Sequence, residues 1–161
     1  SPAVALAGKL LPQTLLFTLL FAFCDVYFYK IMHYPCNSGI WSMVLLGFLT
    51  VIASQAFGIF LFGLFIGQMR VSMCLCSLWG ILSFSVAGFT YPVTAMSPFL
   101  RNLAWLFPLR HYYLIYVNQA LNGYSIVYVW SSVAALLCFL ILPLLVMPRY
   151  RPAFLKYKYQ P

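Results

Sequence analysis

Four long blocks of apolar residues run along this chain, separated by short polar or basic breaks. A membrane-spanning helix needs about 20 mostly apolar residues to cross roughly 30 Å of hydrocarbon, and each block is close to that length. The blocks predict spans over residues 10–30, 40–67, 71–88 and 124–147, with a kink at Pro143 in the last one. A basic segment over residues 148–161 follows. The pattern predicts an all-α integral membrane protein with a single transmembrane domain over residues 1–161.

A fifth segment, residues 89–123, is too apolar for a solvated loop and too interrupted to cross a membrane. Pro92, Pro98 and Pro108 cut it into pieces that are each too short to span. Backbone that leaves helical form at membrane depth must be buried in protein or face water. The segment is therefore predicted to be re-entrant or interfacial, and it is the main candidate for the functional region.

Local signals predict two short helices inside this segment. Ser97 is a suitable N-cap, and Pro98 follows it at the first helical position. Pro108 can start a second helix, which Gly123 is suited to end. That second helix is only about 20 Å long at 1.5 Å per residue, so it cannot cross alone. The prediction is a re-entrant helical hairpin.

Composition narrows the class of protein further. The chain is 65% hydrophobic and 6% charged, whereas a soluble domain needs a far more charged surface. The net charge of +8 does not indicate nucleic acid, because the nine cations are scattered among apolar runs. The five cysteines form no disulfide framework, and Cys74 and Cys76 point to different helix faces, so no metal site is expected. The aromatic residues, 19% of the chain, are expected in interfacial belts and packing rather than in a ligand cage.

Charge also predicts the orientation. Cytoplasmic loops of membrane proteins carry an excess of Lys and Arg. The predicted location is the inner (plasma) membrane, with both ends of the chain in the cytoplasm. This orientation places six cations on the cytoplasmic side: Lys9, Arg70, Arg149, Arg151, Lys156 and Lys158. It places three on the external side: Lys30, Arg101 and Arg110. The hairpin is then expected on the external side, and the basic tail is expected to bind anionic membrane lipid.

Polar and small residues inside the spans are further candidates. Ser54, Gln55, Ser83 and Ser85 could line a pathway, although a glutamine at mid-depth can instead bond a neighbouring helix. Small residues let helices approach closely in lipid, and they are expected at helix contacts within one subunit or between two: Gly58, Gly63 and Gly67, the last two forming a G-x-x-x-G.

Asp25 is the single acidic residue of the chain. An acid within the membrane is a functional candidate by default, but Asp25 is expected near the outer interface. There it is expected to pair with Lys30 or with an arginine of the broken segment. The two histidines, His33 and His111, are expected to be packing residues, with a metal or proton role as the alternative.

A string of motifs resembles the signature of type-2 ABC transporter permeases. The run Ala87-Gly88-Phe89-Thr90-Tyr91-Pro92-Val93 is similar to that family's Gly-Phe-x-x-Pro element, and Met96, Pro108-Leu109-Arg110-His111-Tyr112 and a terminal Gly123 follow in the family's order. The start, Ser1-Pro2 through Gly8-Lys9-Leu10-Leu11-Pro12, also resembles the family. The chain has Met96-Ser97-Pro98 where the family usually has Met-Pro, which could shift the first short helix by one residue.

The resemblance implies the third to sixth spans of a six-span export permease, the carboxy-terminal part of the subunit. Two such subunits, identical or different, would form the pathway, and separate ATP-binding subunits would drive it. The sequence has no Walker A pattern, so ATP and Mg²⁺ are expected on the partner and this chain is not expected to be an enzyme. The hairpin would close the outer end of the pathway, through Gly88, Phe89, Pro92, Met96, Pro108, His111 and Tyr112, with His111 and Tyr112 as anchors.

Two points stay open at this stage. A channel or accessory membrane subunit without ATP coupling has the same composition as a permease. The substrate is also unknown, although the apolar surroundings of the polar candidates favour an amphipathic or drug-like molecule.

Overall fold

The computed structural model describes residues 2–66 and 68–156, and every regular element in these ranges is helical. The long elements are α1 (Pro2–Val26), which continues as the π-helix η1 (Tyr27–Ile31), then α2 (Ile40–Leu64), α3 (Met69–Val86), α6 (Trp130–Phe139) and α7 (Leu142–Lys156).

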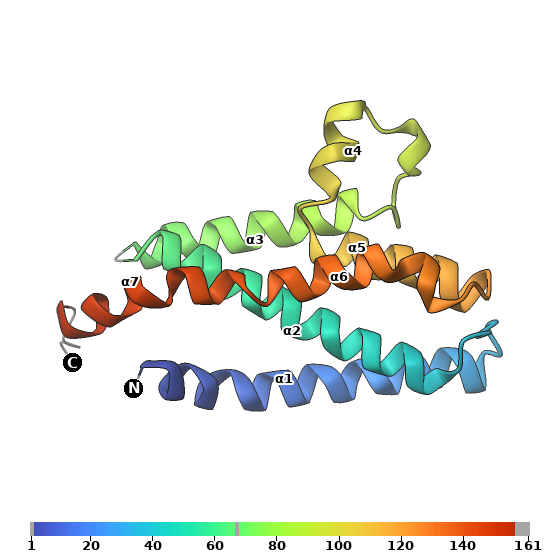
Figure 1. Cartoon of the computed structure of the whole chain (residues 1–161), viewed down its shortest axis with the longest axis horizontal. Helices are drawn as coiled ribbons and strands as arrows, with labels where there is room; N and C mark the ends of the chain where they lie inside the picture. The colour runs from blue at the N-terminus through green and yellow to red at the C-terminus, as the bar shows by residue number, and fades with distance from the viewer. Residues whose placement is uncertain (1, 67, 157–161) are drawn as a thin grey trace.

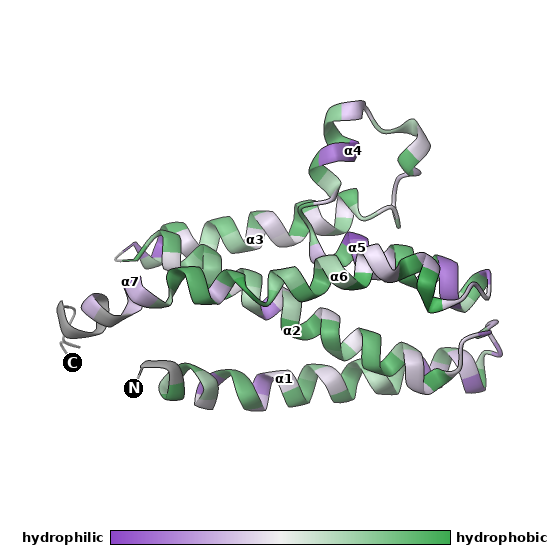
Figure 2. Cartoon of the chain, in the orientation of Figure 1, coloured by the Kyte–Doolittle hydropathy of each residue, from purple (hydrophilic) through white to green (hydrophobic). Residues whose placement is uncertain are grey.

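Four helical stretches are long and apolar enough to cross a membrane: Val4–Ile31, Ile40–Leu64, Met69–Val86 and Ile126–Tyr150. Figure 2 shows apolar residues along the length of these helices. The predicted fold class, an all-α integral membrane protein with four spans, is confirmed. The helical boundaries differ from the predicted ones at the last span, because α7 continues past Met147 through Pro148 and Pro152. Part of the expected basic tail is therefore helical, and residues 157–161 lie outside the described ranges.

The last span is broken rather than gently kinked. α6 ends at Phe139, and Leu140 and Ile141 form a turn before α7 begins. Their amides donate to the carbonyls of Leu137 and Cys138, each three residues earlier. Pro143 has no N–H with which to continue the α-helical pattern, which explains why the break lies just before it.

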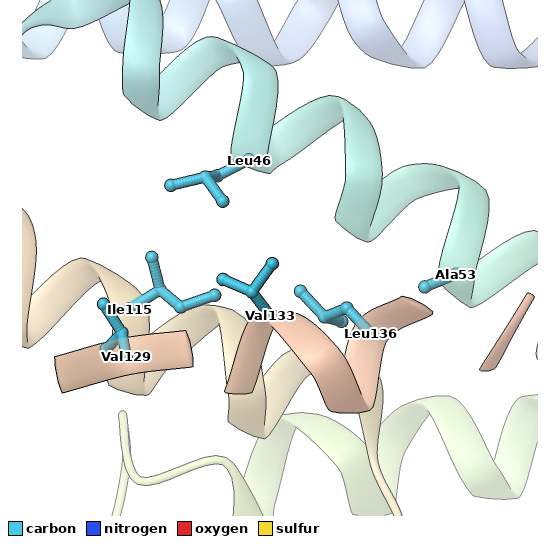
Figure 3. Packing of buried hydrophobic residues seen from close by; sticks show 6 residues of the cluster. All are labelled: Leu46, Ala53, Ile115, Val129, Val133 and Leu136. Atoms are coloured by element: carbon cyan, nitrogen blue, oxygen red, sulfur yellow. The ribbon is translucent and has the colours of Figure 1, made fainter. Parts of the chain in front are cut away.

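The helix α2 is the centre of the bundle. It crosses diagonally between α1 on one side and α6 and α7 on the other (Figure 1), and it also contacts α3 and α5. A buried apolar cluster fills the space between α2, α5 and α6 (Figure 3): Leu46, Ala53, Ile115, Val129, Val133 and Leu136. This cluster holds the helix α5 of the predicted hairpin, Pro108–Ile115, against the spanning helices.

Glycines of α2 allow two close helix contacts. Gly47 lies against the ring of Phe21 in α1, and Gly63 lies against Val146 in α7. Near Gly63 the hydroxyl of Tyr150 donates a 2.9 Å hydrogen bond to the carbonyl of Ile59. Gly58 differs, because a methyl group built there would have no neighbour within 4 Å in the described part of the chain. Gly67 lies outside that part.

Candidate functional site

The segment after α3 folds into the two expected short helices. A single turn, η2 (Val93–Ala95), precedes α4 (Pro98–Ala104), and α5 (Pro108–Ile115) continues as the π-helix η3 (Tyr116–Leu121). The Ser97 side chain accepts a 3.4 Å hydrogen bond from the Leu100 amide, as an N-cap does. Figure 1 shows α4 projecting sideways from the bundle, whereas α5 returns to lie along α6.

Gly88 and Arg110 form the junction between α3 and α5. The Arg110 side chain is only 7% exposed, and its Nη1 donates a 2.9 Å hydrogen bond to the carbonyl of Ala87, the C-cap of α3. A cation at this position satisfies a free carbonyl and interacts favourably with the negative end of the helix. Gly88 has φ of +108°, and a Cβ on it would lie 2.8 Å from the Tyr113 ring and 2.9 Å from Arg110 Nη1. Glycine therefore permits both the left-handed turn and the approach of α5.

From the sequence, Arg110 was counted among three cations on the external side, and the burial of its side chain was not predicted. The position of Arg110 within an apolar run, between Leu109 and His111, was the sequence signal from which its burial could have been predicted. Nothing in the sequence alone showed that the end of α3 would lie beside it.

His111 joins the start of α5 to the end of α4. Its side chain is 1% exposed, and its Nε2–H donates to the carbonyl of Trp105 over 2.9 Å. The imidazole lies 5.5 Å from the Trp105 ring and 6.1 Å from the Phe139 ring, measured between centroids. Burial lowers the pKa of His111, the hydrogen bond to Trp105 opposes this, and the nearby Arg110 lowers it further. His111 is therefore neutral at pH 7.

This lowered pKa predicts that the protein loses stability in acid. The imidazole of the unfolded chain has its ordinary pKa of 6.5 and binds a proton that the buried imidazole does not. The stability is thus fully present above pH ~6.5 and is lost as the pH falls below it. Between pH 7.5 and pH 5.5, the Tm measured by thermal unfolding in detergent should fall further for the parent protein than for His111→Gln. The exposed histidine variant His33→Gln is the matched control, and an equal effect of both variants would contradict the assignment.

The other predicted hairpin residues lie in two groups. Tyr112 is buried with Tyr29, Met43 and Ala120, and its ring makes an edge contact with Phe21 of α1, 5.3 Å between centroids. Pro108 is buried at the first position of α5, and Phe89 lies 4.5 Å from the Tyr113 ring. Pro92 and Met96 are the caps of the turn η2. The predicted gate residues therefore do not form one cluster. Gly88 and Phe89 lie beside Tyr113 at the α3–α5 junction, whereas Tyr112 packs against α1 and α2, and His111 lies between Trp105 and Phe139.

A polar contact at the far end of the hairpin was not predicted. Asn37, in the connection between α1 and α2, donates from its backbone to the Ala120 carbonyl and from its side chain to the Leu121 carbonyl, each over 3.3 Å. Gly123 ends η3 with φ of +68°, and a Cβ there would lie 3.1 Å from that of Asn37. These contacts attach the end of the hairpin to the loop after the first span.

The predicted pathway residues do not share one cavity. Ser54 and Ser83 line a cavity of about 380 Å³ between α2 and α3, together with Gly58 and Trp79. Ser85 is exposed, and its hydroxyl donates to the Ile81 carbonyl of its own helix over 3.0 Å.

Gln55 faces α1 instead. The Thr14 hydroxyl lies 2.7 Å from the Gln55 side-chain oxygen and 2.8 Å from the Leu10 carbonyl, and its single hydrogen can serve only one of them at a time. Gln55 also lines a second cavity, of about 550 Å³, between α1 and α2. The alternative in which this glutamine bonds a neighbouring helix is the one found in the structure.

Asp25 is 7% exposed near the end of α1. Its Oδ2 is buried and has no hydrogen-bond partner in residues 2–66 and 68–156, so the expected pairing with Lys30 or an arginine is not found there. Asp25 instead lines a third cavity, of about 420 Å³, between α1 and the hairpin.

Comparison with known proteins agrees with the motifs of the hairpin. A family described as ABC-2 family transporter protein matches residues 1–147. Searches of curated proteins and of solved structures gave no significant match. The family match covers most of the chain and includes all four spans up to Met147 and the whole hairpin. This chain therefore belongs to the ABC-2 transporter family and is a membrane permease component of an ABC transporter.

Proposed function

We propose that this chain is the permease subunit of an ATP-driven exporter in the plasma membrane. It forms half of a translocation pathway, and a second permease subunit, identical or different, forms the other half. ATP is hydrolysed with Mg²⁺ on a separate ATP-binding subunit. Within the family assignment, the observation that carries this proposal is the hairpin over residues 89–123. Hydrogen bonds attach its helix α5 to the end of α3 and its last residues to the loop after the first span.

The distribution of cations supports an orientation for the complex. The start of α1, the connection between α2 and α3, and the end of α7 lie at one end of the bundle (Figure 1). Three exposed cations lie close to these helix ends: Lys9, Arg70 and Arg149. By the positive-inside preference this end is cytoplasmic and offers the surface on which the ATP-binding subunit docks.

In this orientation the hairpin lies in the external half of the membrane domain and acts as the outer gate. Its contacts to the bundle include a few specific polar ones, at Ala87 and Asn37, and α4 projects away from the bundle. A gate needs an element whose attachments can be exchanged without unfolding the spans. The cavity with Ser54 and Ser83 lies next to the start of α5 and is otherwise lined by residues such as Phe57, Leu61 and Trp79. Such a lining supports an amphipathic or drug-like cargo.

The test is ATP-driven uptake into inside-out membrane vesicles. The chain is purified with its natural partners in lipid nanodiscs and assayed for Mg²⁺-dependent ATP hydrolysis, and the vesicles are assayed with an amphipathic fluorescent dye. We expect a co-purifying ATPase and dye uptake that stops when the Walker A lysine of that ATPase is replaced. Dye movement that proceeds equally without ATP would indicate a channel, and a native complex without ATPase activity would contradict the proposal.

A further inference from the structure

The cavity beside Asp25 combines a buried acid with several aromatic rings. It has a volume of about 420 Å³, which is within the usual range for small-molecule sites. Its lining includes Asp25 and rings from three separate parts of the chain: Phe28 and Tyr29 of η1, Tyr34 of the following loop, and Tyr112 and Tyr116 of the hairpin. Aromatic residues were expected in belts and packing, whereas these five, with Phe21 and Phe89, line one cavity together with the acid.

The acid lacks the partner that a buried carboxylate normally has. Asp25 is 7% exposed, and its Oδ2 is without a hydrogen-bond partner in the part of the chain that the structure describes. Burying an ionised carboxylate without a partner is strongly unfavourable. Lys30, the nearest cation in the sequence, is exposed and makes no ion pair with Asp25 within the described ranges. A ligand of opposite charge would remove this penalty.

The aromatic rings that line the cavity are the second feature expected of a cation-binding site. A cation over the face of a tyrosine or phenylalanine is attracted by the ring quadrupole, and desolvation strengthens the attraction. Tyr29 and Tyr112 are buried, 9% and 8% exposed. Two of the ring-bearing segments, η1 and η3, are π-helices. Each continues directly from an α-helix, and they carry Tyr29 and Tyr116 of the cavity lining.

We propose that this cavity binds an organic cation of the quaternary ammonium or alkylammonium class. The Asp25 carboxylate is the counter-ion, and the rings of Tyr29, Tyr112 and Tyr116 surround the cationic head. An apolar tail can extend between α1 and the hairpin. The inference that the cavity binds such a cation depends only on the residues that line it. The inference that such cations are the exported cargo rests on the proposed function.

Binding is tested on the purified complex in lipid nanodiscs, with benzyltrimethylammonium as the probe and isothermal titration calorimetry as the readout. Benzenesulfonate, an anion of similar size, is the ligand control. We expect binding of the cation and at least tenfold weaker binding of the anion. Asp25→Asn should weaken cation binding at least tenfold, because one partner of a buried charge pair is removed.

Two further variants guard against misfolding and non-specific effects. Tyr34 is 50% exposed, so Tyr34→Leu should fold normally and weaken binding about threefold. Gln13→Ala, at an exposed polar position of the same helix α1, should leave binding unchanged. Equal affinity of Asp25→Asn and the parent protein, or of cation and anion, would overturn the site.

The uptake assay separates this inference from the proposed function. If ATP-driven uptake of an uncharged amphipathic dye persists in Asp25→Asn while the parent protein fails to bind the cation, the exporter stands and the cation site is wrong. If the parent protein binds the cation with Asp25 dependence but no ATP-driven uptake is found, the binding site stands and the cargo assignment is wrong.

Discussion

Gly88→Val is expected to lower the free energy of unfolding by about 3 kcal/mol, the largest effect of any single change considered for this chain. Gly88 has φ of +108°, which a β-branched residue does not tolerate without strain. Its Cβ would also lie 2.8 Å from Tyr113 and 2.9 Å from Arg110. If the guanidinium moves away, the hydrogen bond from Arg110 to the Ala87 carbonyl is lost. Thermal unfolding in detergent measures the effect.

Gly80 provides the matched control for this substitution. It lies in α3, and a methyl group built there has no neighbour within 4 Å in the described ranges. Gly80→Val should therefore change the stability by less than about 1 kcal/mol. A double-mutant cycle with Arg110→Ala then tests the mechanism, because the two substitutions share one contact and should be less than additive. Strict additivity, or equal losses for Gly88→Val and Gly80→Val, would contradict this account of the junction.

Gly63→Val is expected to have the second largest effect, about 2 kcal/mol. The added side chain would overlap Val146 of α7, and the nearby hydrogen bond from Tyr150 to the Ile59 carbonyl holds the two helices at this close distance. The helices would have to separate, which weakens the packing on which helix association in lipid depends. The readout is the Tm of the purified complex.

Gly58→Val is the control for Gly63→Val, and it also tests whether Gly58 lies at the contact between two subunits. Gly58 has open space beside it within the described part of the subunit, so this variant should unfold at the parent temperature. The sequence left open whether the glycines of this helix pack within one subunit or between two. Loss of the dimer in Gly58→Val, measured by mass photometry with the Tm unchanged, would place Gly58 at the subunit contact. A drop in Tm equal to that of Gly63→Val would contradict the assignment of the two glycines.

Much of the fold could be predicted because its signals are local. Spans follow from apolar length, and the starts of α4 and α5 follow from Ser97-Pro98 and Pro108. Gly123 ends the hairpin with the positive φ that its residue type favours. None of these features depends on how the helices pack against each other.

The candidate sites could be predicted only in part, because they depend on helix rotation and packing. Spans that are apolar all round carry no signal for which face points inward. Ser54 and Gln55 are neighbours in sequence, yet they line different cavities on different sides of α2. The position of Asp25 along its helix predicted a depth near the outer interface but not that its side chain would line a cavity with the hairpin. The burial of Arg110 required the close approach of α5 that Gly88 permits.

As the gate of an ATP-driven pathway, the hairpin over residues 89–123 must move during transport. The most direct test fixes it in place with a disulfide between Asn37→Cys and Gly123→Cys, in a background with the five native cysteines replaced. The two Cβ positions are 3.1 Å apart, shorter than the roughly 3.5–4.5 Å of a disulfide, so the loop must move outward by a few tenths of an ångström for the bond to form. ATP-driven dye uptake into inside-out vesicles should stop on oxidation and return on reduction, while each single-cysteine variant is unaffected by oxidant. Undiminished uptake with the disulfide fully formed would contradict the claim.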